Sequence, residues 1–206
     1  MPPARTLVTL IRHGETSANV DGIWHGSLDT ALTERGRSQA ERVAAHLVKT
    51  RADATALYAS PLARARDTAS PIARRLRLAP RYEDDLREYH LGDWEGMTYA
   101  ELVREHRIFE RMKSEPDWQP GGGESARQVA ERLAARIAAI AAQHVGERVI
   151  VVTHGGALAL ALGLLIDREV SAWRRVMQNC AVSDLMFDPE PSLVCFNEVT
   201  HLEDLP

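Results

Sequence analysis

The sequence predicts an α/β protein, a three-layer α/β/α sandwich around a mostly parallel central sheet. Short β-rich runs alternate with amphipathic helical segments, and two of these runs end in His-Gly. Parallel sheets place their chemistry at the ends of such strands. The length of 206 residues and an apolar fraction of 45% agree with one domain spanning 1–206.

Two strands are expected at the centre of the sheet. Residues 7–11 form a β-rich run that ends at Arg12-His13-Gly14, and residues 149–152 form a buried run that ends at Thr153-His154-Gly155. If these strands are parallel neighbours, their tips bring His13 and His154 together.

A further strand is expected at residues 56–59, followed by a helix. Ser60 and Pro61 match the capping residue and the first helical position. Pro71 should bend or split that helix, because proline removes a backbone donor and crowds the preceding turn.

The remaining elements follow from capping signals and apolar runs. Thr33 is expected to cap an early helix, and Ser125 with Gln128 has capping-box spacing before a long amphipathic helix. Apolar runs at 182–187 and 193–199 flank a proline-rich turn, which predicts a hairpin and an antiparallel edge strand.

Composition excludes several classes of function. A net charge of -4 argues against broad nucleic-acid binding. The longest apolar run, 157–166, is too short to span a membrane, and the N-terminus lacks the pattern of a signal peptide, so we expect a cytoplasmic protein. Cys180 and Cys195 have no CxxC spacing and are interpreted as reduced core residues.

Arg12 and His13 suggest phosphate chemistry. A guanidinium can hold phosphate oxygens while a neutral imidazole attacks the phosphorus, and Gly14 allows close backbone approach. A lone histidine at a strand end is more often structural, and the tripeptide Arg-His-Gly alone is weak evidence. The functional interpretation therefore depends on further motifs.

Those motifs occur in one order along most of the chain. They are Arg12-His13-Gly14-Glu15-Thr16 with Asn19, Leu32-Thr33-Glu34-Arg35-Gly36, Ser60-Pro61-Leu62-Ala63-Arg64, Leu86-Arg87-Glu88 with Gly92-Asp93-Trp94-Glu95-Gly96, and Thr153-His154-Gly155. With them the sequence resembles the histidine phosphatase superfamily, the phosphoglycerate-mutase-like family, in its phosphatase branch.

The resemblance implies a metal-independent phosphatase without a cofactor, acting on a small-molecule phosphate monoester through a phosphohistidine. It also implies a small helical cap inserted at about 94–124. The implied site residues are His13 as nucleophile, Arg12 and Arg64 as phosphate clamps, His154 as a phosphate-binding donor beside Gly155, Glu88 as proton donor, and Thr16 and Asn19 in the phosphate pocket.

The proton donor cannot be chosen from the residues alone. Asp84, Asp85, Glu88, Asp93 and Glu95 are all candidates, and the resemblance selects Glu88. Aromatic and apolar neighbours in the sequence are expected to favour the protonated form of Glu88.

Three alternatives stay open. A phosphoglycerate mutase would use the same pocket, but family mutases carry a longer arginine-rich insertion; here Arg104, Arg107 and Arg111 have the spacing of a solvated helix face. A non-catalytic phospho-ligand-binding module would not need both His13 and Glu88. A metal hydrolase is disfavoured because Arg12 and Arg64 would repel a divalent cation.

Other features remain open. His25 stands where the family usually has glutamine, and it either alters the pocket rim or has no role. The C-terminal strands and Trp173 offer a surface for a homodimer, an assembly common in the family. The leaving-group pocket is expected to be shaped by the cap residues Tyr99, His106, Phe109, Met112 and Trp118.

Overall fold

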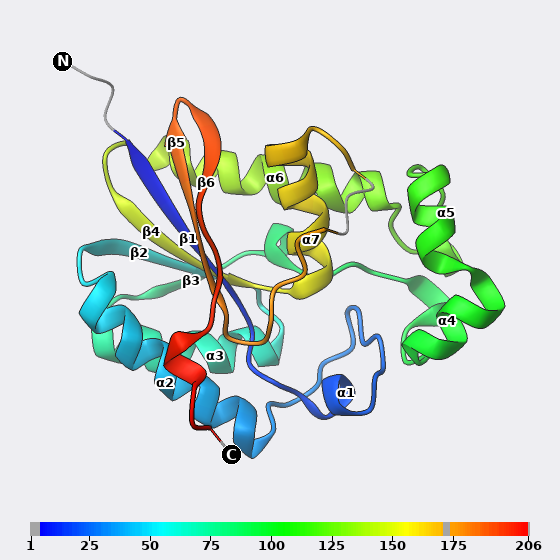
Figure 1. Ribbon diagram of the computed structural model, residues 1–206, viewed down its shortest axis with the longest axis horizontal. Coiled ribbons are helices and arrows are strands. Elements are labelled where there is room, and N and C mark those ends of the chain that lie inside the picture. Colours follow the sequence, from blue (N-terminus) through cyan, green and yellow to red (C-terminus); the bar gives the residue numbers. More distant parts are fainter. Residues whose placement is uncertain (1–4, 171–173, 206) are drawn as a thin grey trace.

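The computed structural model describes residues 5–170 and 174–205, and its centre is a six-stranded sheet in the order β3-β2-β4-β1-β5-β6 (Figure 1). Strands β1 to β4 are parallel, β5 pairs antiparallel with β1, and β6 pairs antiparallel with β5. The strands span Thr6–Arg12 (β1), Ala54–Ala59 (β2), Pro80–Tyr82 (β3), Arg148–Thr153 (β4), Val182–Asp188 (β5) and Glu190–Glu198 (β6).

Helices α2 and α3 cover one face of the sheet, and α6 and α7 cover the other (Figure 1). These layers confirm the predicted α/β fold. Helices α4 and α5 lie beside each other at one end of the molecule, within the segment 94–124 where a cap is expected. The helices span Ser17–Val20 (α1), Glu34–Thr50 (α2), Ala63–Leu76 (α3), Tyr99–His106 (α4), Ile108–Ser114 (α5), Ala126–Gln143 (α6) and Gly155–Leu162 (α7).

Alternation along the central strands produces two separate apolar cores. In β4, Val149 and Val151 belong to the core under α6 and α7, whereas Ile150 and Val152 belong to the core under α2 and α3. Because both faces are covered, this strand is apolar at every one of these positions.

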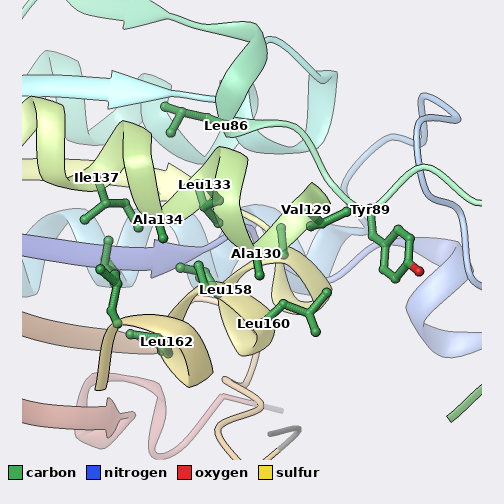
Figure 2. Packing of buried hydrophobic residues seen from close by; sticks show 14 of the residues in the cluster. Leu86, Tyr89, Val129, Ala130, Leu133, Ala134, Ile137, Leu158, Leu160 and Leu162 are labelled. Atoms are coloured by element: carbon green, nitrogen blue, oxygen red, sulfur yellow. The ribbon is translucent and has the colours of Figure 1, made fainter. Parts of the chain in front are cut away.

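The larger core is built from α6 and α7 packed against the sheet. Figure 2 shows Val129, Leu133 and Ile137 of α6 beside Leu158 and Leu162 of α7, and all five side chains are fully buried. The predicted capping box starts α6, since the Ser125 side chain accepts from the backbone of Gln128. Helix α6 directly precedes β4 in the chain, and its packing on the sheet therefore helps to place β4 and His154, the residue that follows β4.

The second predicted helix differs from its expectation in two ways. It begins at Ala63, after Leu62, so Ser60 is not its cap; the Ser60 hydroxyl instead contacts His154. Pro71 lies inside an unbroken α3. The carbonyl that loses its helical donor belongs to exposed Asp67, where water can replace the missing N–H.

The predicted C-terminal hairpin is confirmed as β5 and β6. One strand, β5, runs against the others, but it lies one position in from the edge because β6 covers it. Trp173 lies outside the described residues, so the homodimer stays a prediction. Within 5–170 and 174–205, no helix combines the length and apolar character needed to cross a bilayer.

A buried polar network joins β1, β5, β6 and the end of α2. The Thr9 hydroxyl donates to Asp184 Oδ1 at 2.6 Å, and Arg51 Nη2 donates to Asp184 Oδ2 at 2.9 Å and to Glu198 Oε2 at 3.0 Å. Asp184 and Arg51 are both buried. Asp184 is therefore the acceptor for the Thr9 hydroxyl, and it shares the Arg51 guanidinium with Glu198.

We expect Asp184→Ala to lower the free energy of unfolding by about 2 kcal/mol or more, because it leaves a buried guanidinium and hydroxyl short of an acceptor. Asp117→Ala is the matched control: its carboxylate pairs with Arg127 at 2.6 Å but is 73% exposed. This control should cost at most about 1 kcal/mol in urea unfolding. Equal losses in the two variants would contradict the importance of the network.

Candidate active site

The parallel pairing of β1 with β4 brings the two His-Gly motifs together. Arg12 is paired with Thr153, and the His13 backbone N–H donates to the Thr153 carbonyl at 2.9 Å. The ring centroids of His13 and His154 are 5.1 Å apart. The strand tips therefore meet as the sequence predicts.

His13 presents one ring nitrogen as a possible nucleophile. Its Nδ1 lies 2.8 Å from the carbonyl oxygen of Gly14. A carbonyl only accepts, so Nδ1 carries the hydrogen and Nε2 keeps its lone pair. The ring is 1% exposed, and its orientation is fixed by the residue that follows it.

The electrostatic setting keeps both imidazoles neutral. Burial lowers the pKa of His13 well below its ordinary value of 6.5, and the positive charges of Arg64 and Arg12 lower it further. Burial and Arg64 lower the pKa of His154 in the same way. A neutral ring at position 13 is the form that can attack phosphorus.

Arg12 reaches the site with its Nη1 hydrogen-bonded to the backbone and its Nε–H without a partner among the described residues. Its Nη1 donates to the Met177 carbonyl at 2.7 Å, whereas its buried Nε has no hydrogen-bond partner among the described residues. A Cβ at position 155 would lie 2.9 Å from that Nε. Gly155 is therefore needed for the guanidinium to pass this close to the backbone.

Arg64 is fully buried next to His154. It donates to the carbonyls of Gly26 (2.6 Å) and Leu28 (2.8 Å), and its Nε donates to His154 Nδ1 at 3.2 Å. His154 Nε2 in turn lies 2.7 Å from the Ser60 hydroxyl. Burial lowers the pKa of Arg64 to about 10, so it remains a cation near neutrality. Neither Arg64 nor His154 is among the residues that line the cavity.

Glu88 is held by backbone donors at the start of α7. Its Oε1 accepts from Ala157 at 2.6 Å and from Tyr89 at 2.9 Å, and its Oε2 accepts from Gly156 at 3.0 Å. A Cβ at Gly156 would lie 2.9 Å from Oε1. The setting is thus more polar than the apolar one expected from the neighbouring sequence, because these N–H groups stabilise a carboxylate.

Thr16 and Asn19 occupy different places relative to the cavity. Thr16 is buried and caps α1, with its side chain accepting from the Asn19 backbone. Asn19 lines the cavity, and its Oδ1 accepts from Asn179 Nδ2 at 3.1 Å. Asn179 also donates to the His13 carbonyl at 2.9 Å, so one side chain joins the backbone at His13 to the side chain of Asn19.

A cavity of about 330 Å³ is lined by Arg12, His13, Asn19 and Glu88, but not by Thr16, Arg64 or His154. Of the expected cap residues, Tyr99 and Phe109 line it, whereas His106 and Trp118 stack around Trp94 and Met112 is buried in the core. Its lining comprises Arg12, His13, Asn19, Trp24, His25, Glu88, Tyr99, Phe109, Gly155, Gly156 and Val176. In the part of the chain that the structure describes, no group of three or more histidine, cysteine or acidic residues is placed to hold a metal ion.

His25 is part of the cavity wall. It is 4% exposed, its ring centroid lies 5.7 Å from that of His13, and its Nδ1 lies 2.7 Å from the Thr30 hydroxyl. Burial, followed by the charges of Arg64 and Arg12, lowers the pKa of His25 to about 3. Of the two readings left open by the sequence, the structure supports the one that places His25 at the pocket.

Several residues of the site escaped sequence reasoning. Trp24 directly precedes His25, and that adjacency was an available signal. Ser60 lies in a recognised motif, but its contact with His154 does not follow from that motif. Asn179 and Val176 lie in no motif, because their positions depend on how distant segments pack.

Comparison with known proteins agrees with this geometry. Residues 8–198 match the family model of the histidine phosphatase superfamily (branch 1). The chain is 37% identical over 204 residues to a metal-independent phosphoserine phosphatase from Arabidopsis thaliana, covering 97% of this chain and 84% of that protein. It is 37% identical over 181 residues to a glucosyl-3-phosphoglycerate phosphatase from Mycobacterium tuberculosis, covering 82% and 79%.

Solved structures give the same result. A phosphoserine phosphatase from Entamoeba histolytica in complex with 3-phosphoglyceric acid superposes with a TM-score of 0.86 at 28% identity, over 96% of this chain and 99% of that one. A mycobacterial glucosyl-3-phosphoglycerate phosphatase in complex with VO3 gives 0.83 at 32% identity, over 94% and 99%. The chain belongs to the histidine phosphatase superfamily.

Proposed function

We propose that this protein is a metal-independent phosphatase that hydrolyses monoesters of small phosphorylated metabolites through a phosphohistidine at His13. The observation that carries the proposal is the bare Nε2 of a neutral His13 in one cavity with Arg12 and Glu88. The relatives named as phosphoserine and glucosyl-3-phosphoglycerate phosphatases support the same reaction class.

In the first step, Nε2 of His13 attacks the phosphorus in line with the departing oxygen. A nitrogen–phosphorus bond forms while the phosphorus–oxygen bond to the leaving group breaks. Protonated Glu88 gives its proton to the leaving oxygen and becomes a carboxylate. The backbone N–H groups of Tyr89, Gly156 and Ala157 are placed to stabilise that carboxylate.

In the second step, water replaces the histidine. The Glu88 carboxylate takes a proton from the attacking water, an oxygen–phosphorus bond forms, and the nitrogen–phosphorus bond breaks. Inorganic phosphate leaves, His13 is neutral again, and Glu88 is protonated for the next cycle.

The positive groups stabilise charge on the phosphoryl oxygens in both steps. Arg12 contributes its uncommitted Nε–H, and each terminal nitrogen of Arg64 keeps a second hydrogen beyond those donated to Gly26 and Leu28. His154 accepts from Arg64 at Nδ1, so its Nε2 carries hydrogen. When substrate binds, this N–H stops donating to the Ser60 hydroxyl and donates to a phosphoryl oxygen instead.

The arginines that could hold the carboxylate of a phosphoglycerate intermediate in a mutase are engaged outside the cavity. Arg104 pairs with Glu105 at 2.7 Å, Arg107 Nε donates to Glu110 at 2.6 Å, and Arg111 lies over the Trp118 ring at 5.0 Å. None of the three arginines lines the cavity. These contacts favour release to water over return of the phosphoryl group to an acid-bearing alcohol.

Replacing His13 with alanine should abolish both turnover and labelling. We expect hydrolysis of p-nitrophenyl phosphate to fall at least about 10³-fold, because no other group replaces the nucleophile. Acid-labile phosphate on the protein should disappear in a rapid-quench assay. His144→Gln is the control, since His144 contacts Tyr58 and Glu147 away from the cavity. A non-catalytic binding module would give no turnover even in the unaltered protein.

Replacing Glu88 with glutamine should depend on the leaving group. We expect kcat/KM for an alkyl phosphate to fall by about 10² to 10⁴, because an alkoxide needs a proton. The loss for p-nitrophenyl phosphate should be much smaller, because a nitrophenolate departs without one. Asp93→Asn, a change outside the cavity lining, should leave both values close to those of the unaltered enzyme. Equal losses for the two esters would remove Glu88 as general acid.

Acid should weaken the fold through the buried histidines. The folded-state pKa values of His13, His25 and His154 lie below the ordinary value of 6.5, so below that pH the unfolded chain binds protons that the folded chain excludes. Stability is therefore lost as the pH falls, at up to about 1.4 kcal/mol per pH unit for each ring. Urea unfolding between pH 7.5 and 5.5 should show a shallower loss in His25→Gln. Identical slopes would contradict the assignment.

A further inference from the structure

Three aromatic side chains meet on the wall of the active-site cavity. The Trp24 ring centroid lies 5.4 Å from that of Tyr99 and 6.2 Å from that of Phe109, and all three residues line the cavity. Trp24 is 3% exposed, whereas Tyr99 and Phe109 are 39% and 37% exposed. The accessible part of this aromatic wall therefore comes from Tyr99 and Phe109, supported by Trp24 beneath them.

Backbone contacts hold Trp24 against the segment that leads into α4. Trp24 donates to the Met97 carbonyl at 2.9 Å, and Gly96 donates back to the Trp24 carbonyl at 3.0 Å. Tyr99 follows Thr98, which caps α4 through a capping box. The backbones that carry Trp24 and Tyr99 are thus held by paired hydrogen bonds and a helix cap, and such support favours binding of one flat face.

The same cavity is poor in positive charge beyond what a phosphate needs. Among the described residues that line it, Arg12 is the only lysine or arginine. With Arg64 behind it, two guanidinium charges balance one phosphate dianion. A further carboxylate on the substrate would find no second cation among the described lining residues, and it would repel Glu88 whenever Glu88 is ionised.

Resting on the proposed function, we propose that the substrate's leaving group is uncharged and packs an apolar or planar face on Tyr99 and Phe109, which Trp24 supports. Phosphate esters of carboxylate-bearing alcohols are then poor substrates. Serine and glycerate both carry a carboxylate, so this specificity separates the chain from the relatives named for phosphoserine and glucosyl-3-phosphoglycerate.

A matched pair of esters tests the charge preference. In 4-carbamoylphenyl phosphate and 4-carboxyphenyl phosphate the para substituents have nearly the same size, and only the second is charged at pH 7.5. We expect kcat/KM to be at least about tenfold higher for the carbamoyl ester, because the cavity leaves the carboxylate unpaired. A ratio near one, or a preference for the carboxylate, would overturn the inference.

Two exposed valines provide a matched pair of variants. Val176 lines the cavity and is 53% exposed; Val103 lies on α4 outside the lining and is 47% exposed. Val176→Arg should lower the carbamoyl-to-carboxy ratio at least about threefold by supplying the missing cation. Val103→Arg should leave the ratio unchanged. If both variants change it equally, the effect comes from overall charge and the inference fails.

The aromatic contribution is tested separately. Phe109→Ala should reduce kcat/KM for phenyl phosphate about tenfold and for methyl phosphate by a smaller factor, because only the first ester has a ring to stack. Equal losses would overturn the role of the wall. Failure of the proposed function has another signature: the unaltered protein would hydrolyse neither phenyl nor methyl phosphate. Turnover of both without the expected preferences would refute only the specificity.

Discussion

The parallel pairing of β1 with β4 is the constraint on which the rest of the site depends. It aligns Arg12 with Thr153 and sets the rings of His13 and His154 5.1 Å apart, although most of the chain separates them in sequence. Both strands are buried on both faces, so a shift in register would turn their side chains to the wrong core. Apolar packing on the two faces therefore fixes the positions of the polar groups at the strand ends.

Placing these polar groups together at the strand ends buries charged guanidinium groups beside imidazoles. Arg12 and Arg64 lie near three buried imidazoles, which remain neutral because burial and the guanidinium charges lower their pKa values. The positive charges attract a dianion, and the lowered pKa keeps His13, the proposed nucleophile, unprotonated. Backbone carbonyls and N–H groups hold the surrounding side chains: Gly14 orients His13, and the first turn of α7 holds Glu88.

Sequence reasoning predicted the features that depend on local pattern. The strands ending at His13 and His154, the caps at Thr33 and Ser125, and the terminal hairpin all follow from periodicity and capping chemistry, and the structure confirms them. It misplaced the start of α3, because tertiary contact of Ser60 with His154 outweighed a local capping signal. It also left the role of His25 open. It missed Asn179, which contacts His13 from a distant part of the chain that no local pattern connects to it.

Which acidic residue serves as the proton donor also depends on long-range contacts and not on local sequence. Five carboxylates lie close together in sequence, yet Glu88 alone among them lines the cavity. Its partners come from the start of α7, almost seventy residues later, and glycine at position 156 makes room for it. A pattern of residue types near Glu88 cannot contain that information.

A crystal structure of the protein with orthovanadate tests the central claim most directly, because vanadate forms a bond to a nucleophile that attacks phosphorus. The account predicts vanadium bonded to Nε2 of His13, with its equatorial oxygens near Arg12 and Arg64 and the Glu88 carboxyl group on the side of the leaving oxygen. Vanadium bonded to the ring of His25 or His154, or bound away from all three rings, would contradict it.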